Sequence, residues 1–260
     1  MNVLAIVSAK GGVGKTTIAA NLGAALAVNR RVVCMDLDPQ NALRLHLGVA
    51  MDEFDGVARC TLENRRWNTA IFQSPGSPEI LPFGTVNEAD RDTFEVYLAE
   101  HQNWLAQGLQ SLHLKDDDCI VIDTPPGPSL YLQQALRAAN FVLVVLHADA
   151  ASYATVPAIE GLIQRYCRER EGFNGSAYVL NNVNTDKALS RDVTEILRSS
   201  LGDRLAPMVI HQDEAVRESL ASDQLLADYD PHCEATFDLA SCGQWVADKL
   251  AANRKPSARK

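Results

Sequence analysis

The stretch Ala9-Lys10-Gly11-Gly12-Val13-Gly14-Lys15-Thr16-Thr17 decides the fold of this chain. Its three glycines allow the backbone to bend closely around an anion with several N–H groups pointing inward, and a following helix would add the positive end of its dipole. A short apolar run precedes it at residues 4–7, and a segment with helical spacing follows at residues 18–28. This strand, loop and helix order predicts a phosphate-binding loop. The alternative is a glycine-rich turn that binds nothing.

The two lysines of the loop have different predicted tasks. Lys15 supplies a positive charge for the β- and γ-phosphates of a nucleotide, and the hydroxyl of Thr16 can complete the coordination of a bridging Mg²⁺ ion. Lys10 has no such task within its own loop. From the turn it can reach the phosphates of a nucleotide held by a second, facing copy, so its presence predicts a face-to-face dimer. Ala9 replaces the glycine of the strict motif, and alanine still fits a tight exit from a strand.

The composition indicates one large α/β unit. The chain has 260 residues, of which 47% are hydrophobic, and a formal net charge of −9 that opposes broad binding to nucleic acid. We expect a single domain at residues 1–252 and a disordered basic tail at residues 253–260. The six scattered cysteines are expected to be free thiols in a reducing cytoplasm. A positive leader is absent and no apolar run reaches the ~20 residues of a membrane span, so we expect a cytoplasmic protein.

Apolar runs rich in branched residues alternate along the chain with segments of helical spacing. This alternation predicts an α/β fold, a doubly wound and mainly parallel sheet flanked by helices, with ligands at the carboxyl ends of the strands. The expected strands are residues 3–7, 31–35, 79–82, 119–122, 141–146, 177–180 and 207–210. The expected helices are residues 16–28, 91–114, 129–138, 154–170, 186–201, 214–221 and 235–252.

Aspartates follow two of the expected strands. Asp36 and Asp38 end one strand, where both carboxylates can approach the phosphate site from one crevice. Asp123 ends another strand and suits a residue that holds a Mg²⁺-bound water. An aspartate at a strand end is often only a turn residue or a helix cap, which is the alternative for each motif taken alone. Their order after a phosphate loop favours the functional interpretation.

With these motifs the sequence resembles the ParA/MinD ATPases, which carry a deviant Walker A loop. The resemblance rests on residues 10–17, on Asp36-Leu37-Asp38-Pro39-Gln40 and on Asp123-Thr124-Pro125-Pro126-Gly127. It implies ATP and Mg²⁺ as cofactors and a homodimer with two nucleotides sandwiched at the interface. By position, Lys10 crosses to the partner's nucleotide and Asp38, assisted by Asp36, orients the attacking water. The resemblance implies nucleotide contacts from the loop and metal contacts from two residues. The nucleotide-binding set is Lys10, Gly11, Gly12, Val13, Gly14, Lys15, Thr16 and Thr17, and the metal set is Thr16 and Asp123.

A further strand end is expected to contact the base. In residues 178–183 the resemblance places Asn181 against adenine, with Asn182 as the alternative, because an amide both donates and accepts hydrogen bonds. An asparagine that only forms a turn after the strand is the competing interpretation. His211 stands where the family often has proline, and it is either a polar residue satisfied at a strand end or a ligand of the nucleotide.

Within the family the chain resembles the BcsQ branch, ATPases encoded with bacterial cellulose synthase. The resemblance is carried by residues 80–84, 180–182 and 205–221. It implies a slowly hydrolysing ATPase that assists assembly, localisation or activation of a membrane-embedded cellulose synthase complex. It also implies small cytoplasmic accessory proteins as partners and recruitment to the inner membrane through them. Neither direct nucleic-acid binding nor direct membrane insertion is expected.

Three other functions compete with this one. A ParA-type DNA partitioning motor needs a basic surface, whereas Arg165, Arg168 and Arg170 alternate with glutamates as on a solvated helix face. A MinD-type membrane switch would end in an amphipathic helix, and the basic tail lacks large apolar residues. A scaffold that hardly hydrolyses ATP is disfavoured because both lysines and all three aspartates are present.

Overall fold

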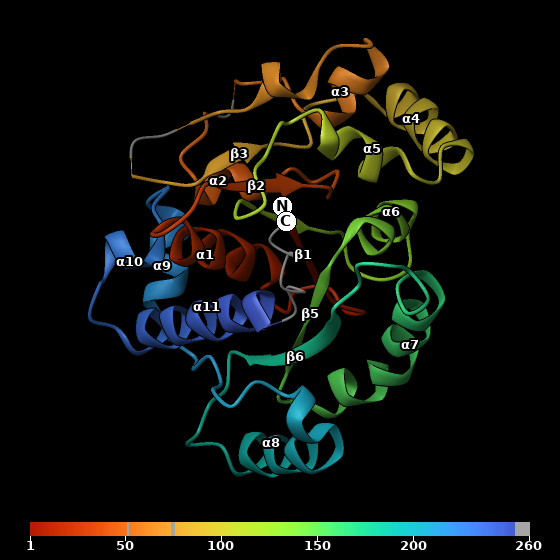
Figure 1. Cartoon of the computed structure of the whole chain (residues 1–260). Coiled ribbons are helices and arrows are strands. Elements are labelled where there is room, and N and C mark those ends of the chain that lie inside the picture. Colours follow the sequence, from red (N-terminus) through yellow and green to blue (C-terminus); the bar gives the residue numbers. More distant parts are fainter. Residues whose placement is uncertain (51, 74–75, 253–260) are drawn as a thin grey trace, which may run out of the picture.

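A computed structural model of the chain describes residues 1–50, 52–73 and 76–252. Within these residues six parallel strands form one sheet in the order β3-β2-β4-β1-β5-β6 (Figure 1). The predicted α/β fold with a parallel sheet is confirmed. The expected disordered tail lies outside the described residues. The strands are β1 (Asn2–Val7), β2 (Val32–Asp36), β3 (Glu79–Leu81), β4 (Cys119–Asp123), β5 (Phe141–His147) and β6 (Gly175–Asn181).

Helices cover both faces of the sheet (Figure 1). One face packs against α1 and α11 and the other against α6 and α7, in two separate apolar clusters. The longer helices are α1 (Lys15–Ala27), α4 (Glu88–Glu100), α5 (Trp104–Gln110), α6 (Leu130–Ala138), α7 (Ala150–Tyr166), α8 (Ala188–Leu201), α9 (Ala215–Ala221) and α11 (Glu234–Ala252). The short ones are α2 (Leu43–His46), α3 (Val57–Leu62), α10 (Leu226–Tyr229) and the 3₁₀ turns η1 (Trp67–Ala70) and η2 (Gly202–Arg204).

The central strand β1 positions the phosphate-binding loop. Leu4 and Ile6 pack in the cluster that contains α1, whereas Val3, Ala5 and Val7 pack in the opposite cluster. Alternate residues of a strand point to opposite faces, so a strand buried on both sides has to be apolar throughout. The carboxyl end of β1 therefore leads out of the core into the loop and then into α1.

Residues 207–210 do not form the strand that the apolar run predicted. The segment pairs only at isolated points, at Leu205 opposite Tyr178 in β6 and at His211 opposite Val183, two residues after β6 ends. The Ala206 amide donates to the Tyr178 carbonyl and the Ile210 amide donates to the Leu180 carbonyl, each at 2.8 Å. From Ala206 to Ile210 the segment advances by four residues, whereas from Tyr178 to Leu180 β6 advances by two. The extra residues of the segment bulge away from β6, so no continuous ladder forms.

The expected helix at residues 91–114 is divided into α4 and α5. The side chain of Gln134 on α6 inserts at the break, where its Nε2 donates to the Leu98 carbonyl at 3.1 Å and the His101 carbonyl at 2.8 Å. Its Oε1 accepts from the Leu105 amide at 3.2 Å. One buried side-chain amide therefore provides hydrogen bonds to carbonyl groups at the end of α4 and to a backbone amide at the start of α5. The sequence also gave no sign of the short helices α2, α3 and α10, because one or two turns show too little periodicity.

In the described part of the chain, no helix combines the length and the apolar character that a membrane crossing requires.

Two helical glycines offer a matched test of packing. A Cβ atom at Gly108 in α5 would lie 2.0 Å from the ring of Trp67, whereas one at Gly161 in α7 would meet nothing within 4 Å. We expect Gly108→Ala to lower the free energy of unfolding by about 1–3 kcal/mol through overpacking. Gly161→Ala should leave it unchanged or raise it by up to about 1 kcal/mol through helix propensity. Urea unfolding of both variants measures the difference, and equal stabilities would contradict the packing at Trp67.

His46 makes stability depend on pH. Its side chain in α2 is 4% exposed. Burial lowers the pKa of His46 from 6.5 to about 4. Between these values the unfolded chain binds a proton that the folded chain does not, so stability is lost as the pH falls through this window. Relative to His46→Gln, the wild type should lose about 3 kcal/mol of unfolding free energy between about pH 7.5 and about pH 4. The exposed His232→Gln is the control, and a pH-independent difference for His46→Gln would refute the prediction.

Candidate functional site

The predicted phosphate-binding loop connects β1 to α1 in a conformation that glycine favours. Gly12 and Gly14 have φ values of 76° and 83°, in the left-handed region. Gly14 is the residue before α1, and no side chain caps the helix there. The first hydrogen bond of the helix runs from the Ile18 amide to the Gly14 carbonyl at 3.0 Å. The amides of Lys15, Thr16 and Thr17 precede it, so they lie in the first turn where a helix N-terminus offers N–H groups to an anion.

Asn181, at the carboxyl end of β6, lies directly against this loop. Its Nδ2 donates to the Val13 carbonyl at 2.8 Å. A Cβ atom at Gly14 would be 2.3 Å from the same nitrogen, so the contact requires glycine at that position. The structure thus brings Asn181 to the loop, with its amide N–H group donating to the protein backbone.

Thr16 and Asp123 form the floor of the site. Thr16 Oγ1 donates to Asp123 Oδ2 at 2.6 Å. Asp123 is 1% exposed, and among the described residues its other oxygen, Oδ1, has no hydrogen-bond partner. The Thr16 oxygen keeps its lone pairs for a metal, and a buried carboxylate oxygen without a donor suits a metal-bound water. These oxygen groups fit Mg²⁺, which takes most of its ligands from waters and phosphates.

Lys15 brings a positive charge to the same place. Its side chain is 6% exposed, and its ammonium makes no hydrogen bond or ion pair with the described residues. The charge acts on Asp123, where it opposes the rise in pKa that burial causes. A buried ammonium without a fixed anionic partner is the group that a nucleotide phosphate requires.

Asp36 and Asp123 are buried beside each other on adjacent strands. The two residues are in register in β2 and β4, and their side chains are 0% and 1% exposed. Burial raises the pKa of Asp123 to about 6, against the opposing effects of the Thr16 hydrogen bond and the Lys15 charge. Burial first, and then the charge of Asp123, raise the pKa of Asp36 well above its ordinary value. Two carboxyl groups in so apolar a place favour the arrival of a cation.

Asp36 holds the loop that carries Asp38. Asp36 Oδ1 accepts from the Asp38 amide at 2.8 Å and Oδ2 accepts from the Leu43 amide at 3.0 Å. Asp38 itself is half-buried, and its carboxylate accepts only from the Gln40 amide at 3.0 Å among the described residues. The buried Asp36 is therefore placed to position the loop, whereas Asp38 is placed to meet a ligand.

Lys10 forms an ion pair within its own chain. Its Nζ lies 3.1 Å from Asp149 Oδ2, and the two side chains are 41% and 38% exposed. Asp149 precedes α7, where its Oδ1 accepts from the Ser152 amide at 2.6 Å and caps the helix. The predicted reach of Lys10 toward a second copy stays a prediction, and in the single chain the lysine rests against the start of α7.

A cavity of about 250 Å³ opens beside the loop on the side of Asn181. Polar groups from four separate segments converge on it. Its lining residues are Gly12, Gly14, Thr17, His147, Asn181, Asn182, His211, Asp213, Val216 and Arg217. A cavity next to a phosphate-binding loop, lined by amides and imidazoles, can take a heterocyclic base.

His211 is both satisfied by the protein and part of this cavity. Its Nδ1 lies 2.8 Å from Asp238 Oδ2, and its backbone amide donates to the same oxygen at 2.9 Å. Asp238 belongs to α11, so the last helix fixes the orientation of the ring. Both interpretations of His211 left open by the sequence are thus compatible with its position.

Sequence reasoning missed several residues of the site. Asp149, His147, Asp213 and Arg217 all lie near the loop, yet none belongs to a motif that predicts this. The one available signal was Asp149 three residues before Ser152, which is a helix-capping pattern and says nothing about Lys10.

Comparison with known proteins identifies the family. A family model described as "Cellulose biosynthesis protein BcsQ" matches residues 1–247. The chain belongs to the BcsQ family. It is 26% identical over 258 residues to the cellulose biosynthesis protein BcsQ of Escherichia coli strain K12, with 98% of each chain covered. The predicted resemblance to the ParA/MinD-type P-loop ATPases is likewise confirmed.

Other members of this wider group match over nearly the whole chain. The chromosome partitioning protein ParA of Caulobacter vibrioides strain NA1000 is 30% identical over 248 residues, covering 90% of this chain and 89% of that protein. The septum site-determining protein MinD of Pyrococcus horikoshii OT3, solved with Mg-ADP, superposes with a TM-score of 0.77 at 24% identity, covering 98% and 99% of the chains. The structural likeness shows a common fold.

The Asp36 contacts lead to a test of how the site is positioned. Asp36→Ala removes both acceptors, so the Leu43 amide should exchange its hydrogen at least about tenfold faster, in line with loss of a hydrogen bond to a carboxylate. Asp38→Ala removes a neighbouring carboxylate and leaves the Leu43 contact intact. Residue-resolved hydrogen exchange on the nucleotide-free protein measures both, and similar exchange at Leu43 in the two variants would contradict the positioning role.

Proposed function

We propose that this protein binds ATP with Mg²⁺ and hydrolyses it slowly, as a homodimer with ATP at the interface. The observation that carries the proposal is the Thr16–Asp123 pair beneath the phosphate-binding loop. Among the described residues Asp123 Oδ1 has no hydrogen-bond partner, and the Lys15 ammonium lies close enough to act on the Asp123 charge. In the described residues no group of three or more His, Cys, Asp or Glu is arranged to hold a metal by itself. A metal here would thus arrive together with phosphate oxygens, as Mg²⁺ does with ATP.

Each group has a role in phosphoryl transfer. The amides of the loop and Lys15 bind and orient the phosphates, and Thr16 and Asp123 would hold Mg²⁺, directly and through water. When bound, Mg²⁺ neutralises charge that develops on the phosphates. Asp38, kept in place by Asp36, orients the water that attacks the γ-phosphate. Asn181 and the cavity beside it accommodate the base.

Dimerisation would complete the site. Lys10 would leave Asp149 and contact the phosphates of the facing subunit's nucleotide. The Lys10–Asp149 pair is about two-fifths exposed, so breaking it costs little, on the order of 0–1 kcal/mol. Asp149 would keep its capping bond to Ser152 through the other oxygen, so α7 stays intact.

The biological role follows from the family. We propose that the ATP-dependent dimer assists assembly, localisation or activation of a bacterial cellulose synthase complex. It would act in the cytoplasm as one ATPase domain at residues 1–252, recruited to the inner membrane through small accessory proteins. Support comes from the BcsQ family match and from the likeness to the Escherichia coli BcsQ protein.

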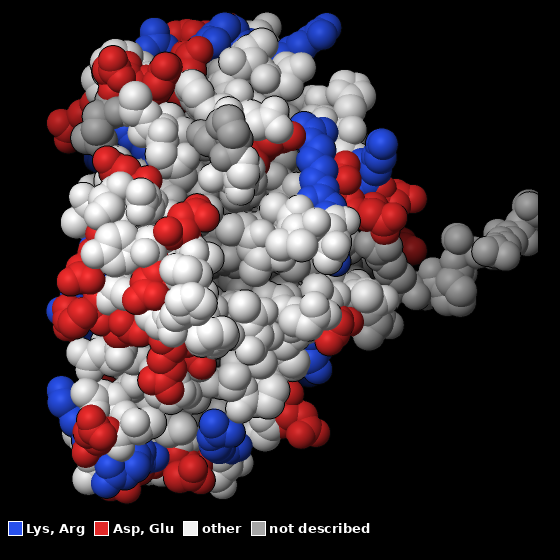
Figure 2. Space-filling model, turned by 90° about the vertical axis from the view of Figure 1, so that its left-hand side faces the viewer, with Lys and Arg blue, Asp and Glu red and all other residues white. Residues whose placement is uncertain are grey.

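Two alternatives have less support in the structure. A DNA-partitioning role would need exposed basic residues, yet Arg170 turns inward to the Ala139 carbonyl. On the face shown in Figure 2, Lys and Arg are scattered among acidic and uncharged residues and do not form one continuous basic surface. The structure argues against membrane binding by α11, because its apolar residues Val246 and Leu250 are buried against α1 and so are not available to a membrane. We therefore expect neither direct nucleic-acid binding nor membrane insertion.

Four proteins test the proposed mechanism. Lys15→Ala should lose at least about tenfold in ATP affinity, because a charged contact to phosphate is removed. Lys10→Ala should bind ATP yet fail to hydrolyse it, and Asp38→Ala should form a long-lived ATP-bound dimer. Lys115→Ala, an exposed lysine before β4 and away from the loop, is the matched control. ATP titration, light scattering on the eluting dimer and phosphate release provide the readouts.

Turnover that is identical in all of these proteins would reject the catalytic assignment. The biological role is tested in a bacterium whose own BcsQ-family gene has been deleted, by measuring cellulose secretion. We expect the wild-type protein to restore secretion and Lys15→Ala not to restore it. Strong ATP-dependent binding to DNA or to liposomes would instead favour the partitioning or the membrane role.

A further inference from the structure

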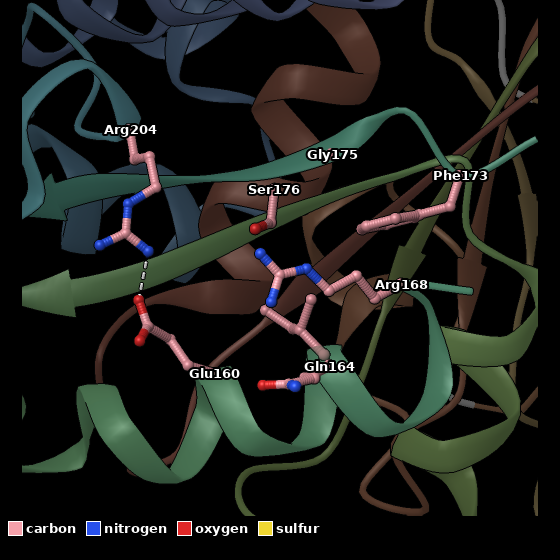
Figure 3. Close-up of a pocket in the computed structure, with 8 residues that line it drawn as sticks. Glu160, Gln164, Arg168, Phe173, Gly175, Ser176 and Arg204 are labelled. Atoms are coloured by element: carbon pink, nitrogen blue, oxygen red, sulfur yellow. Dashed lines mark hydrogen bonds and ion pairs between the residues drawn. The ribbon is translucent and has the colours of Figure 1, made fainter. Parts of the chain in front are cut away.

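A second groove lies at the opposite end of the sheet from the nucleotide site. It has a volume of about 330 Å³ and runs between α7 and the start of β6 (Figure 3). Ser176, which lines it, precedes Asn181 by five residues along the same strand, a distance of about 17 Å at the usual rise of a strand. The groove therefore belongs to neither the phosphate-binding loop nor the base cavity.

The strand edge inside this groove is open. The Tyr178 and Leu180 carbonyls on the outer side of β6 accept from the Ala206 and Ile210 amides. Alternate residues of a strand direct their N–H and C=O groups to the same side, so those of Ser176 face this outer edge as well. The described part of the chain supplies no partner for them. The segment at residues 205–211 thus covers the later half of the edge and leaves its beginning uncovered.

An unpaired cation lies over this open edge. Arg168, just beyond α7, extends toward Ser176, and it makes no hydrogen bond or ion pair with the described residues (Figure 3). Arg204, at the other end of the groove, is already bound to Glu160, which also accepts from the Tyr178 hydroxyl at 3.1 Å. The ring of the half-buried Phe173 forms an apolar wall. One free positive charge, an apolar wall and two free main-chain groups face the same space.

We propose that this groove docks an extended acidic peptide segment of a partner protein, whose backbone pairs with β6 at Ser176 while a carboxylate binds Arg168. Peptides that add to a sheet edge gain affinity from main-chain hydrogen bonds and specificity from side-chain contacts. The guanidinium and carboxylate form the strong, charge-assisted part of the contact.

The chemistry of the groove favours a peptide over other occupants. Main-chain N–H and C=O groups match another backbone, whereas a phosphodiester chain offers only acceptors. One guanidinium also supplies far less positive charge than binding to a nucleic acid requires, because such binding depends on several Lys or Arg contacts to phosphates. The chain's own residues 253–260 carry two arginines and two lysines, so they would be repelled from Arg168.

The charge contact is tested with a defined probe. A fluorescein-labelled hexapeptide of alternating glutamate and valine is titrated with the full-length protein, and fluorescence anisotropy is recorded. We expect Arg168→Glu to weaken binding at least about tenfold, because a charge-assisted contact becomes a repulsion. Arg165→Glu makes the same charge change three residues earlier, within α7 and outside the groove, and it should alter affinity less than about twofold. The matching lysine and valine hexapeptide should not bind.

The backbone contact is tested at Ser176. Ser176→Pro removes the outward N–H group and leaves the bonds of the neighbouring residues to β5, so it should abolish binding, whereas Ser176→Ala should bind as the wild type does. Binding of the hexapeptide should also slow hydrogen exchange at the Ser176 amide. ATP affinity, measured on each variant, reports folding independently of this groove and keeps the test separate from the proposed ATPase function.

Three results would overturn the proposal. The first is that the wild type does not bind the acidic hexapeptide, or that Arg168→Glu binds it equally well. The second is competition by free glutamate or inorganic phosphate as strong as that by the unlabelled peptide, which would make the groove a small-anion site. The third is preference for single-stranded DNA, or self-association of the protein that Arg168→Glu abolishes, either of which would assign a different occupant.

Discussion

Two carboxyl groups, Asp36 and Asp123, are buried side by side at the ends of adjacent strands. Such a pair is unfavourable in an apolar interior unless protons, hydrogen bonds or cations compensate the charge. Two backbone amides compensate Asp36, while Asp123 is compensated by the Thr16 hydroxyl, the nearby Lys15 charge and the Thr124 amide, against a larger effect of burial. The site is therefore electrostatically incomplete in a way that a metal bound to an anionic phosphate would correct. The same cluster fixes the loop that bears Asp38, so the need for a cation and the placement of Asp38 share one structural cause.

The Lys10 contact contributes less energy than the contacts of the buried carboxylates, because it is partly exposed to water. Its ion pair with Asp149 is partly exposed, and pairs of this kind contribute little to stability. Asp149 uses its other oxygen to cap α7, so the helix does not depend on the lysine. The structure thus combines a rigid floor, built from buried groups, with one cationic side chain that is held loosely. This division fits the proposed function, in which the floor would bind the nucleotide and Lys10 would contact a second subunit.

The sequence predicted what depends on neighbouring residues and missed what depends on distant ones. The loop at residues 9–17 and the strand-end aspartates were recognisable because their residue types and spacing are local. The Lys10–Asp149 pair joins residues 139 positions apart, and nothing near either residue signals it. Likewise, Gln134 divides α4 from α5 through contacts that only the tertiary structure creates. The apolar run at residues 207–210 has the composition of a strand. After the hydrogen bond from the Ala206 amide to the Tyr178 carbonyl, however, it no longer keeps a regular register with β6.

One segment connects the two ends of the sheet. It begins at Arg204, which is bound to Glu160 beside the groove, and it ends at His211 and Asp213, which line the cavity next to the phosphate-binding loop. Between them two hydrogen bonds, to the Tyr178 and Leu180 carbonyls, anchor it to β6. Coupling between distant sites requires an element with two arrangements that both sites bias. A segment attached at isolated points is easier to shift than a continuous ladder, because fewer hydrogen bonds have to break together. Residues 204–213 are therefore a segment that contributes side chains both to the groove and to the cavity beside the phosphate-binding loop.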